Sequence, residues 1–216
     1  MIYRILLSLV ISLFIIRLLW ISRSQGWNFN WWINTIHQEF SQLLKNLILT
    51  QHKDQFSRNL RYFFLTVTLF TFILLAITGT LPVIAFNKHI TGILLIIHVT
   101  AAPVFVVALA LTALFWANFK QFDDSDLKLI KKVKNENKDQ RPVYYLQTYW
   151  LKILFWMFLA FSIPAGLSMI FSMFPYFGTD GQNVMLTIHQ YSTLILLIII
   201  FFYTDFKLMV LGKTGK

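Results

Sequence analysis

The chain has 216 residues, of which 57% are hydrophobic and only 13% are charged, and its mean hydropathy is +0.63. Soluble domains contain about twice this fraction of charged residues, so the composition favours an integral membrane protein. The net charge of +10 does not indicate nucleic-acid binding, because the basic residues separate long apolar stretches. The absence of cysteine excludes disulfides, thiolate-ligated clusters and covalently attached c-type haem.

The first apolar stretch covers residues 5–20 and contains Arg17. It is shorter than the roughly 20 residues of a typical membrane span, and no small-residue cleavage pattern follows it. A signal peptide, a membrane anchor and an interfacial helix are the alternatives, and we expect an uncleaved N-terminal membrane anchor over residues 1–22. In residues 23–58, apolar side chains recur at helical spacing, which predicts an amphipathic cytoplasmic segment on the membrane surface. Docking of this segment on the protein's own spans or on a partner is the alternative.

Four longer apolar stretches predict membrane-spanning helices. They cover residues 62–86, 90–119, 149–174 and 183–211. We expect an all-α membrane domain over residues 59–216, in which Pro103 and Pro164 kink their helices. The connection 120–148 mixes lysines with carboxylates and is predicted to be a solvated loop or surface helix.

The distribution of Lys and Arg predicts the topology. Basic residues gather in residues 23–61, in residues 120–152 and in the C-terminal tail, whereas residues 175–182 contain none. Cytoplasmic loops retain Lys and Arg, so these three basic regions are expected to be cytoplasmic. The prediction is a protein of the prokaryotic inner (cytoplasmic) membrane, with its N-terminus outside and its C-terminus in the cytoplasm.

Two of the five histidines, His98 and His189, lie well inside predicted spans, where an ionisable side chain is costly and is typically functional. At about 1.5 Å per residue, His98 lies about 12 Å from residue 90, and His189 lies about 9 Å from residue 183. Two imidazoles at similar depth on two helices suit the axial positions of a b-type haem. The alternative is that each histidine hydrogen-bonds a neighbouring helix and packs without a cofactor.

Other roles for the histidines are less favoured. Zinc needs three or four protein ligands, and Asp205 is the only acid expected within a span. His89 is expected at the outer surface, as a solvated helix cap or as a contact to a haem propionate. His37 and His52 fall in the amphipathic segment and are assigned no role.

Three short motifs occur in the predicted spans. They are Leu74-Leu75-Ala76-Ile77-Thr78-Gly79, Ile97-His98, and Ile188-His189 followed by Tyr203-Thr204-Asp205-Phe206-Lys207 and Gly212-Lys213. With these motifs, residues 58–213 resemble the four-helix membrane cytochrome b subunits of formate dehydrogenases, nickel-iron hydrogenases and thiosulfate reductases. The resemblance implies a four-helix haem-binding transmembrane bundle, preceded here by the N-terminal anchor helix, with His98 and His189 as axial ligands of the haem iron.

In that family, a second haem on the cytoplasmic side is ligated by a histidine in the first span and by another fourteen residues after the outer ligand of the fourth. The corresponding residues here are Leu65 and Tyr203. Leucine cannot coordinate iron, and tyrosine alone is an unusual axial arrangement. The sequence therefore predicts one haem b, and a single haem in the outer half needs another group to complete electron transfer across the membrane.

The resemblance implies an electron-transfer subunit of a membrane oxidoreductase in a respiratory chain, rather than a complete enzyme. Its expected partners are the quinone pool, an iron-sulfur or cytochrome redox subunit, and membrane lipid, with no nucleic acid. The alternative is a cofactor-free membrane scaffold or assembly subunit of a respiratory complex. A transporter is less favoured, because the spans contain almost no paired charges.

Several further residues have two interpretations. Small residues near the level of the predicted haem are expected either to admit the ring or to allow ordinary close helix packing. They are Thr78, Gly79, Ala101, Ala102, Ser192 and Thr193. Arg58 and Arg61 are expected to meet lipid phosphates or a quinone headgroup. The outward loop 174–182 is expected to be an interfacial turn or a docking surface for a redox partner.

Overall fold

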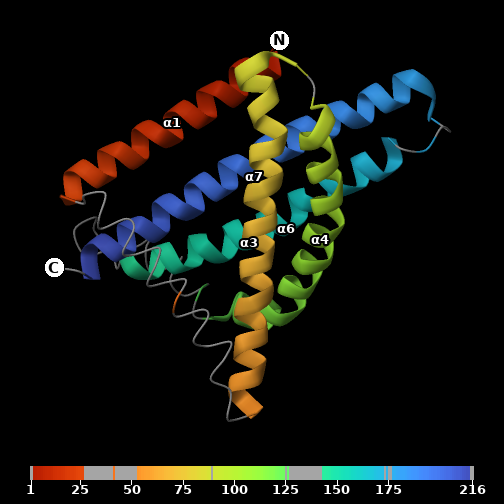
Figure 1. Cartoon of the computed structure of the whole chain (residues 1–216). Coiled ribbons are helices and arrows are strands. Elements are labelled where there is room, and N and C mark those ends of the chain that lie inside the picture. Colours follow the sequence, from red (N-terminus) through yellow and green to blue (C-terminus); the bar gives the residue numbers. More distant parts are fainter. Residues whose placement is uncertain are drawn as a thin grey trace. The chain divides into compact units, whose positions relative to one another are not determined.

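A computed structural model describes residues 2–26, 41, 53–88, 90–124, 126, 143–172, 174 and 177–214 (Figure 1). Within these residues the secondary structure is entirely helical. The elements are α1 (Ile2–Gln25), α3 (Lys53–Phe86), α4 (Gly92–Trp116), the 3-10 helix η1 (Ala117–Phe119), α6 (Val143–Ser172) and α7 (Gly178–Thr214). The chain divides into two compact units, the N-terminal unit Met1–Trp116 and the C-terminal unit Ala117–Lys216.

Five of the described helical segments are long and apolar enough to cross a membrane. They are Ile2–Ser24, Arg58–Phe86, Gly92–Phe119, Tyr149–Ser172 and Gly178–Leu208. Large apolar side chains are exposed on these helices, with Phe70 67% and Leu114 74% accessible. Such faces are unfavourable in water and suit contact with lipid. For the described residues, the predicted all-α architecture is confirmed, with five helices long and apolar enough to span a membrane, one of them near the N-terminus.

In the N-terminal unit, α3 packs against α4 along most of its length, and the two form an antiparallel hairpin (Figure 1). The Phe64 ring stacks on Phe115 at 5.6 Å, and Phe72 meets Phe105 further along. Two threonine hydroxyls pair across the hairpin. The Thr68 and Thr112 hydroxyls, both 2% accessible, lie 2.9 Å apart.

The hairpin turns where α3 ends. Asn87 has a φ of 51°, a left-handed conformation that asparagine adopts more readily than most residues. The Lys88 N–H donates to the Pro82 carbonyl at 3.3 Å. On the neighbouring α1, the Arg4 guanidinium donates to the Ile84 carbonyl at 3.3 Å. The first residues of α1 therefore lie beside the last turn of α3.

In the C-terminal unit, α6 and α7 run side by side in opposite directions (Figure 1). Their shared core contains Leu154, Phe158 and Ala165 from α6 with Leu194, Leu196, Ile199 and Leu208 from α7. Lys120, which precedes α6 in the chain, is hydrogen-bonded to this helix. The Trp156 indole N–H donates to the Lys120 carbonyl at 2.8 Å.

The structure differs from the sequence-based predictions at three points. Helix α7 begins at Gly178, so five residues of the expected loop 174–182 are helical, and Asp180 joins Asp205 as a second acid within a span. Residues 53–58 belong to α3 rather than to a separate segment. Asp126 is buried and is not solvated. The rest of the predicted amphipathic segment lies outside the described residues, apart from Ser41 and the last turn of α1.

Candidate functional site

His98 lies two turns into α4 and is half-buried against α3. Its Nδ1 is 2.9 Å from the Thr78 hydroxyl oxygen. The Thr78 hydroxyl oxygen also lies 2.8 Å from the Leu74 carbonyl. When the hydroxyl donates its hydrogen to that carbonyl, its oxygen accepts from Nδ1–H of His98, and this tautomer leaves Nε2 as the ring nitrogen with the lone pair.

Gly79 gives the His98 ring its space. A Cβ at position 79 would lie 3.2 Å from Cε1 of His98 and 3.7 Å from Nδ1. Contacts of 3.2 Å are tighter than ordinary van der Waals packing, so a larger residue would displace the ring. Thr78 and Gly79, whose small size was expected to admit a porphyrin or to allow helix packing, both contact the imidazole of His98.

His189 lies in α7 and is half-buried against α6. Its Nδ1 is 2.8 Å from the backbone carbonyl of Ala165. A carbonyl only accepts, so His189 also carries its proton on Nδ1 and its lone pair on Nε2. The neighbouring positions Ala165, Ser168 and Ser192 are small and buried, which allows the two helices to approach closely at this level.

The two histidines have the same chemistry. Metal-ligating imidazoles typically donate their second ring N–H to a fixed acceptor, which orients the ring and raises its basicity. The Thr78 hydroxyl does this for His98, and the Ala165 carbonyl does it for His189. His98 belongs to the N-terminal unit and His189 to the C-terminal unit.

The depths of the two histidines differ from expectation when they are measured from the helix starts. His98 is six residues from Gly92 and His189 is eleven from Gly178, which correspond to about 9 Å and about 16 Å. The difference arises because α7 begins with polar residues, including Asp180 in its first turn, where a carboxylate is favourable. The apolar part of α7 starts after Asn183, from which His189 is again about 9 Å along the axis.

Other predicted positions are placed as follows. Leu65 is half-buried in α3, and Tyr203 is half-buried in α7, fourteen residues and nearly four turns after His189. Ala101 and Ser192 are buried. Ala102 and Thr193 are half-buried, and the Thr193 hydroxyl donates to the Gln190 carbonyl. His37, His52 and His89 lie outside the described residues.

The end of the hairpin opposite the turn carries the predicted arginines. Arg58 is exposed, and the Arg61 guanidinium lies 6.0 Å from the centre of the Trp116 ring. The Trp116 indole N–H donates to the Arg61 carbonyl at 3.3 Å. Between the arginines, Asn59 is 4% accessible, and among the described residues neither polar atom of its side chain has a hydrogen-bond partner. Sequence reasoning missed Asn59, although a polar residue between two arginines at a helix end is a usable signal.

The connection before α6 holds a buried ion pair. Lys152 Nζ lies 2.7 Å from Oδ2 of Asp126, and the backbone N–H groups of Asp123 and Asp126 each donate to the other's carboxylate. Burial raises the pKa of the Asp126 carboxyl, but the hydrogen bonds from Lys152 and Asp123 outweigh it and hold the pKa below 3.8. Burial and the charges of Lys152 and Lys207 lower the pKa of the Lys120 ammonium.

In the part of the chain that the structure describes, these observations define an all-helical protein with five helices long enough to span a membrane and with one hydrogen-bonded histidine within each of two of them. Among the same residues, no three His, Asp or Glu side chains group as a metal site. No protein-family model, curated protein or solved structure matches the chain. The resemblance to cytochrome b subunits therefore rests on the sequence motifs alone.

Proposed function

We propose that the chain is a membrane-bound b-type cytochrome subunit, in which His98 and His189 are the axial ligands of a single haem b. It transfers electrons between the quinone pool and a redox partner protein. The observation that carries this proposal is the matched state of the two intramembrane imidazoles. In the proposed site each imidazole donates Nδ1–H to its acceptor, Thr78 or Ala165, and would bind the haem iron through Nε2.

The residues around the histidines have separate tasks in this proposal. The Thr78 hydroxyl and the Ala165 carbonyl hold the Nδ1 protons, fix the rotation of the rings and raise their basicity. Gly79 leaves room for the His98 ring. Haem b, when bound, supplies one-electron redox chemistry. With His98 and His189 both holding the haem, the site would be suited to electron transfer rather than to oxygen binding.

The proposal includes one haem and one topology. Leu65 offers no ligand for a second haem, and Tyr203 alone is a poor substitute for a histidine pair.

The hydrogen bond from Arg4 to Ile84 brings the start of α1 and the turn after α3 to the same end of the N-terminal unit. This supports a topology in which both lie on the outer side of the inner membrane, and in which the C-terminus is cytoplasmic.

The test is a dithionite-reduced-minus-oxidised visible spectrum of the purified full chain, with His98→Ala and His189→Ala alongside. We expect haem bands in the native protein that either substitution removes or alters. Tyr203→Phe is the matched control. It changes the same face of α7, at the position where the resembled family has a ligand of its second haem, and is expected to leave the bands unchanged. A pyridine hemochrome assay is expected to give one haem per chain.

A native protein without haem bands, purified from cells supplied with haem precursor, would overturn the proposal. That result would favour the cofactor-free scaffold, in which the hydrogen bonds to Thr78 and Ala165 serve only to satisfy two histidines in the membrane. Two haems per chain, or loss of haem in Tyr203→Phe, would overturn the single-haem part.

A further inference from the structure

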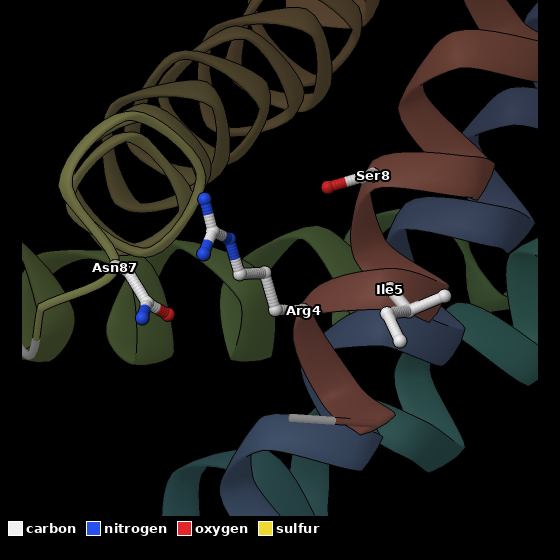
Figure 2. Close-up of a pocket in the computed structure, with 4 residues that line it drawn as sticks. All are labelled: Arg4, Ile5, Ser8 and Asn87. Atoms are coloured by element: carbon white, nitrogen blue, oxygen red, sulfur yellow. The ribbon is translucent and has the colours of Figure 1, made fainter.

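A pocket of about 600 Å³ opens where α1 begins and α3 ends. It is lined by Arg4, Ile5 and Ser8 from α1 and by Asn87 from the turn after α3. Figure 2 shows the Arg4 guanidinium reaching from α1 toward the end of α3, with the Ser8 hydroxyl and the Asn87 amide turned toward the same space. Three hydrogen-bonding side chains therefore converge on one opening at a helix end.

The charge at this end of the N-terminal unit is positive. Arg4 uses one of its five N–H donors on the Ile84 carbonyl, and the exposed Lys88 follows Asn87 in the turn. The segments that form this end, residues 2–13 and 76–98, contain no aspartate or glutamate. An anion therefore has two cations to meet here and no carboxylate of these segments to oppose it.

An apolar stripe on α1 leads away from the pocket. Ile5, Leu9, Leu13 and Ile16 share one face of α1 at spacings of three and four residues, and each is at least half accessible. Ile5 also lines the pocket, so the stripe begins at its edge. A guanidinium at a span end with an apolar stripe below it matches the two parts of a phospholipid.

We propose that this pocket binds the phosphate of an anionic phospholipid, with the acyl chains lying along the Ile5–Ile16 face of α1. The guanidinium of Arg4 binds phosphate through paired, charge-assisted hydrogen bonds, the Ser8 hydroxyl and the Asn87 amide of the lining add further ones, and the charge of Lys88 in the adjoining turn adds longer-range attraction. Because the lining residues come from α1 and from the turn after α3, the bound lipid links α1 to the α3–α4 hairpin. The site is independent of the proposed haem.

The experiment is native mass spectrometry of the full chain, released from neutral detergent with dioleoyl phosphatidylglycerol or with dioleoylglycerol, which lacks the phosphate. We expect the native protein to retain phosphatidylglycerol in preference to dioleoylglycerol. Arg4→Gln is expected to weaken phosphatidylglycerol binding about tenfold, because the amide keeps a donor for Ile84 but loses the charge. Arg23→Gln, an exposed arginine in the last turn of α1, is the matched control and is expected to change binding less than twofold.

Equal weakening by Arg4→Gln and Arg23→Gln would overturn the site, because it would indicate unspecific attraction to charge. Binding of dioleoylglycerol as tight as that of phosphatidylglycerol would also overturn it, and displacement of the lipid by decylubiquinone would identify a quinone site instead. If Arg4→Gln does not fold, Lys88→Gln serves as the second variant. It must weaken phosphatidylglycerol binding several-fold, and unchanged binding contradicts the proposal. Haem content, measured in parallel, is expected to be the same in all variants.

Discussion

The Nδ1 atom of His98 lies 2.9 Å from the hydroxyl oxygen of Thr78, across the contact between α4 and α3. The Thr78 oxygen also lies 2.8 Å from the Leu74 carbonyl of its own helix. When Thr78 donates to that carbonyl, it accepts from Nδ1–H of the histidine. The tautomer of His98 is therefore linked to the direction in which one hydroxyl points.

Thr78→Val is expected to leave the Nδ1–H of His98 without its acceptor. The cost for a buried donor is about 1–3 kcal/mol of stability, and haem affinity is expected to fall about 10–100-fold. Thr78→Ser keeps the hydroxyl and is expected to remain close to the native protein. Haem content per chain and the thermal unfolding midpoint measure both effects. Equal behaviour of the valine and serine variants would contradict this role of Thr78.

Gly79→Ala is expected to displace the His98 ring by a few tenths of an ångström, because the new Cβ meets Cε1 at 3.2 Å. In an ordinary helix interior the same substitution stabilises by about 1 kcal/mol. We therefore expect a destabilising or neutral effect in the native background and a stabilising effect in a His98→Ala background. A thermal unfolding cycle of the four proteins tests this, and additive effects would show that residue 79 and the ring do not interact.

The paired hydroxyls of Thr68 and Thr112 are expected to be energetically coupled. The two oxygens lie 2.9 Å apart, and either hydroxyl can be the donor. Thr68→Val or Thr112→Val removes one partner of this buried hydrogen bond, and each is expected to cost about 1–3 kcal/mol. A double-mutant cycle is expected to give a coupling of about 0.5–2 kcal/mol. A coupling of zero would contradict a hydrogen bond between the helices.

Gly181→Ala is expected to disturb the start of α7. Its Cβ would lie 2.5 Å from Cβ of Phe177, which cannot rotate away as the end of a side chain can. We expect a loss of about 1–3 kcal/mol in spite of the higher helix propensity of alanine. Adding Phe177→Gly to Gly181→Ala is expected to restore stability, because it removes the Cβ of residue 177. Adding Phe177→Ala retains that Cβ and is not expected to restore stability. Thermal unfolding of these variants distinguishes this contact from a general effect of losing the Phe177 ring.

The Asp126–Lys152 ion pair is expected to make stability depend on acid pH. The pKa of Asp126 in the folded protein lies below its ordinary value of 3.8, so its contribution is full above pH 3.8 and is lost as the pH falls through the lower, folded value. Lys152→Met removes the hydrogen bond and the charge that lower the pKa of Asp126, so this pKa is expected to rise. The loss of stability at acid pH is then expected to be smaller than in the native protein. At neutral pH the variant is expected to lose about 3–5 kcal/mol.

Unfolding midpoints measured from neutral pH to below pH 3.8 test this prediction. Asp126→Asn combined with Lys152→Met is the control, because it removes both charges and is expected to be milder than Lys152→Met alone. An unchanged acid profile in Lys152→Met would show that Asp126 is not the group that titrates.

The spans were predictable from sequence because about 20 consecutive apolar residues leave few alternatives to a membrane helix. The start of α7 was not predictable in this way. Its first turn is polar, and it begins at Gly178, whose φ of 59° few other residues adopt and which lies next to the helix-stabilising Asp180. Hydropathy marks the apolar part of a helix rather than its first hydrogen-bonded turn.

The candidate site was predictable only in part, for a similar reason. His98 and His189 stand out because ionisable residues are rare in such stretches. Their hydrogen-bond partners depend on how the helices pair. The partner of His189 is the backbone carbonyl of Ala165, and a backbone carbonyl is present at every residue, so the sequence does not single it out. The burial of Asp126 likewise depends on Lys152, 26 residues further along the chain.

The two polar contacts between α3 and α4 also restrict how this hairpin assembles in a bilayer. Thr68 and Thr78 are ten residues apart on α3, and they meet Thr112 and His98 on α4. Sliding one helix past the other by a single turn would separate both pairs at once and expose two donors to hydrocarbon, where each unmet group costs several kcal/mol. A hairpin inserted with the wrong offset therefore loses two hydrogen bonds. This favours one alignment of α3 against α4 from the moment of insertion.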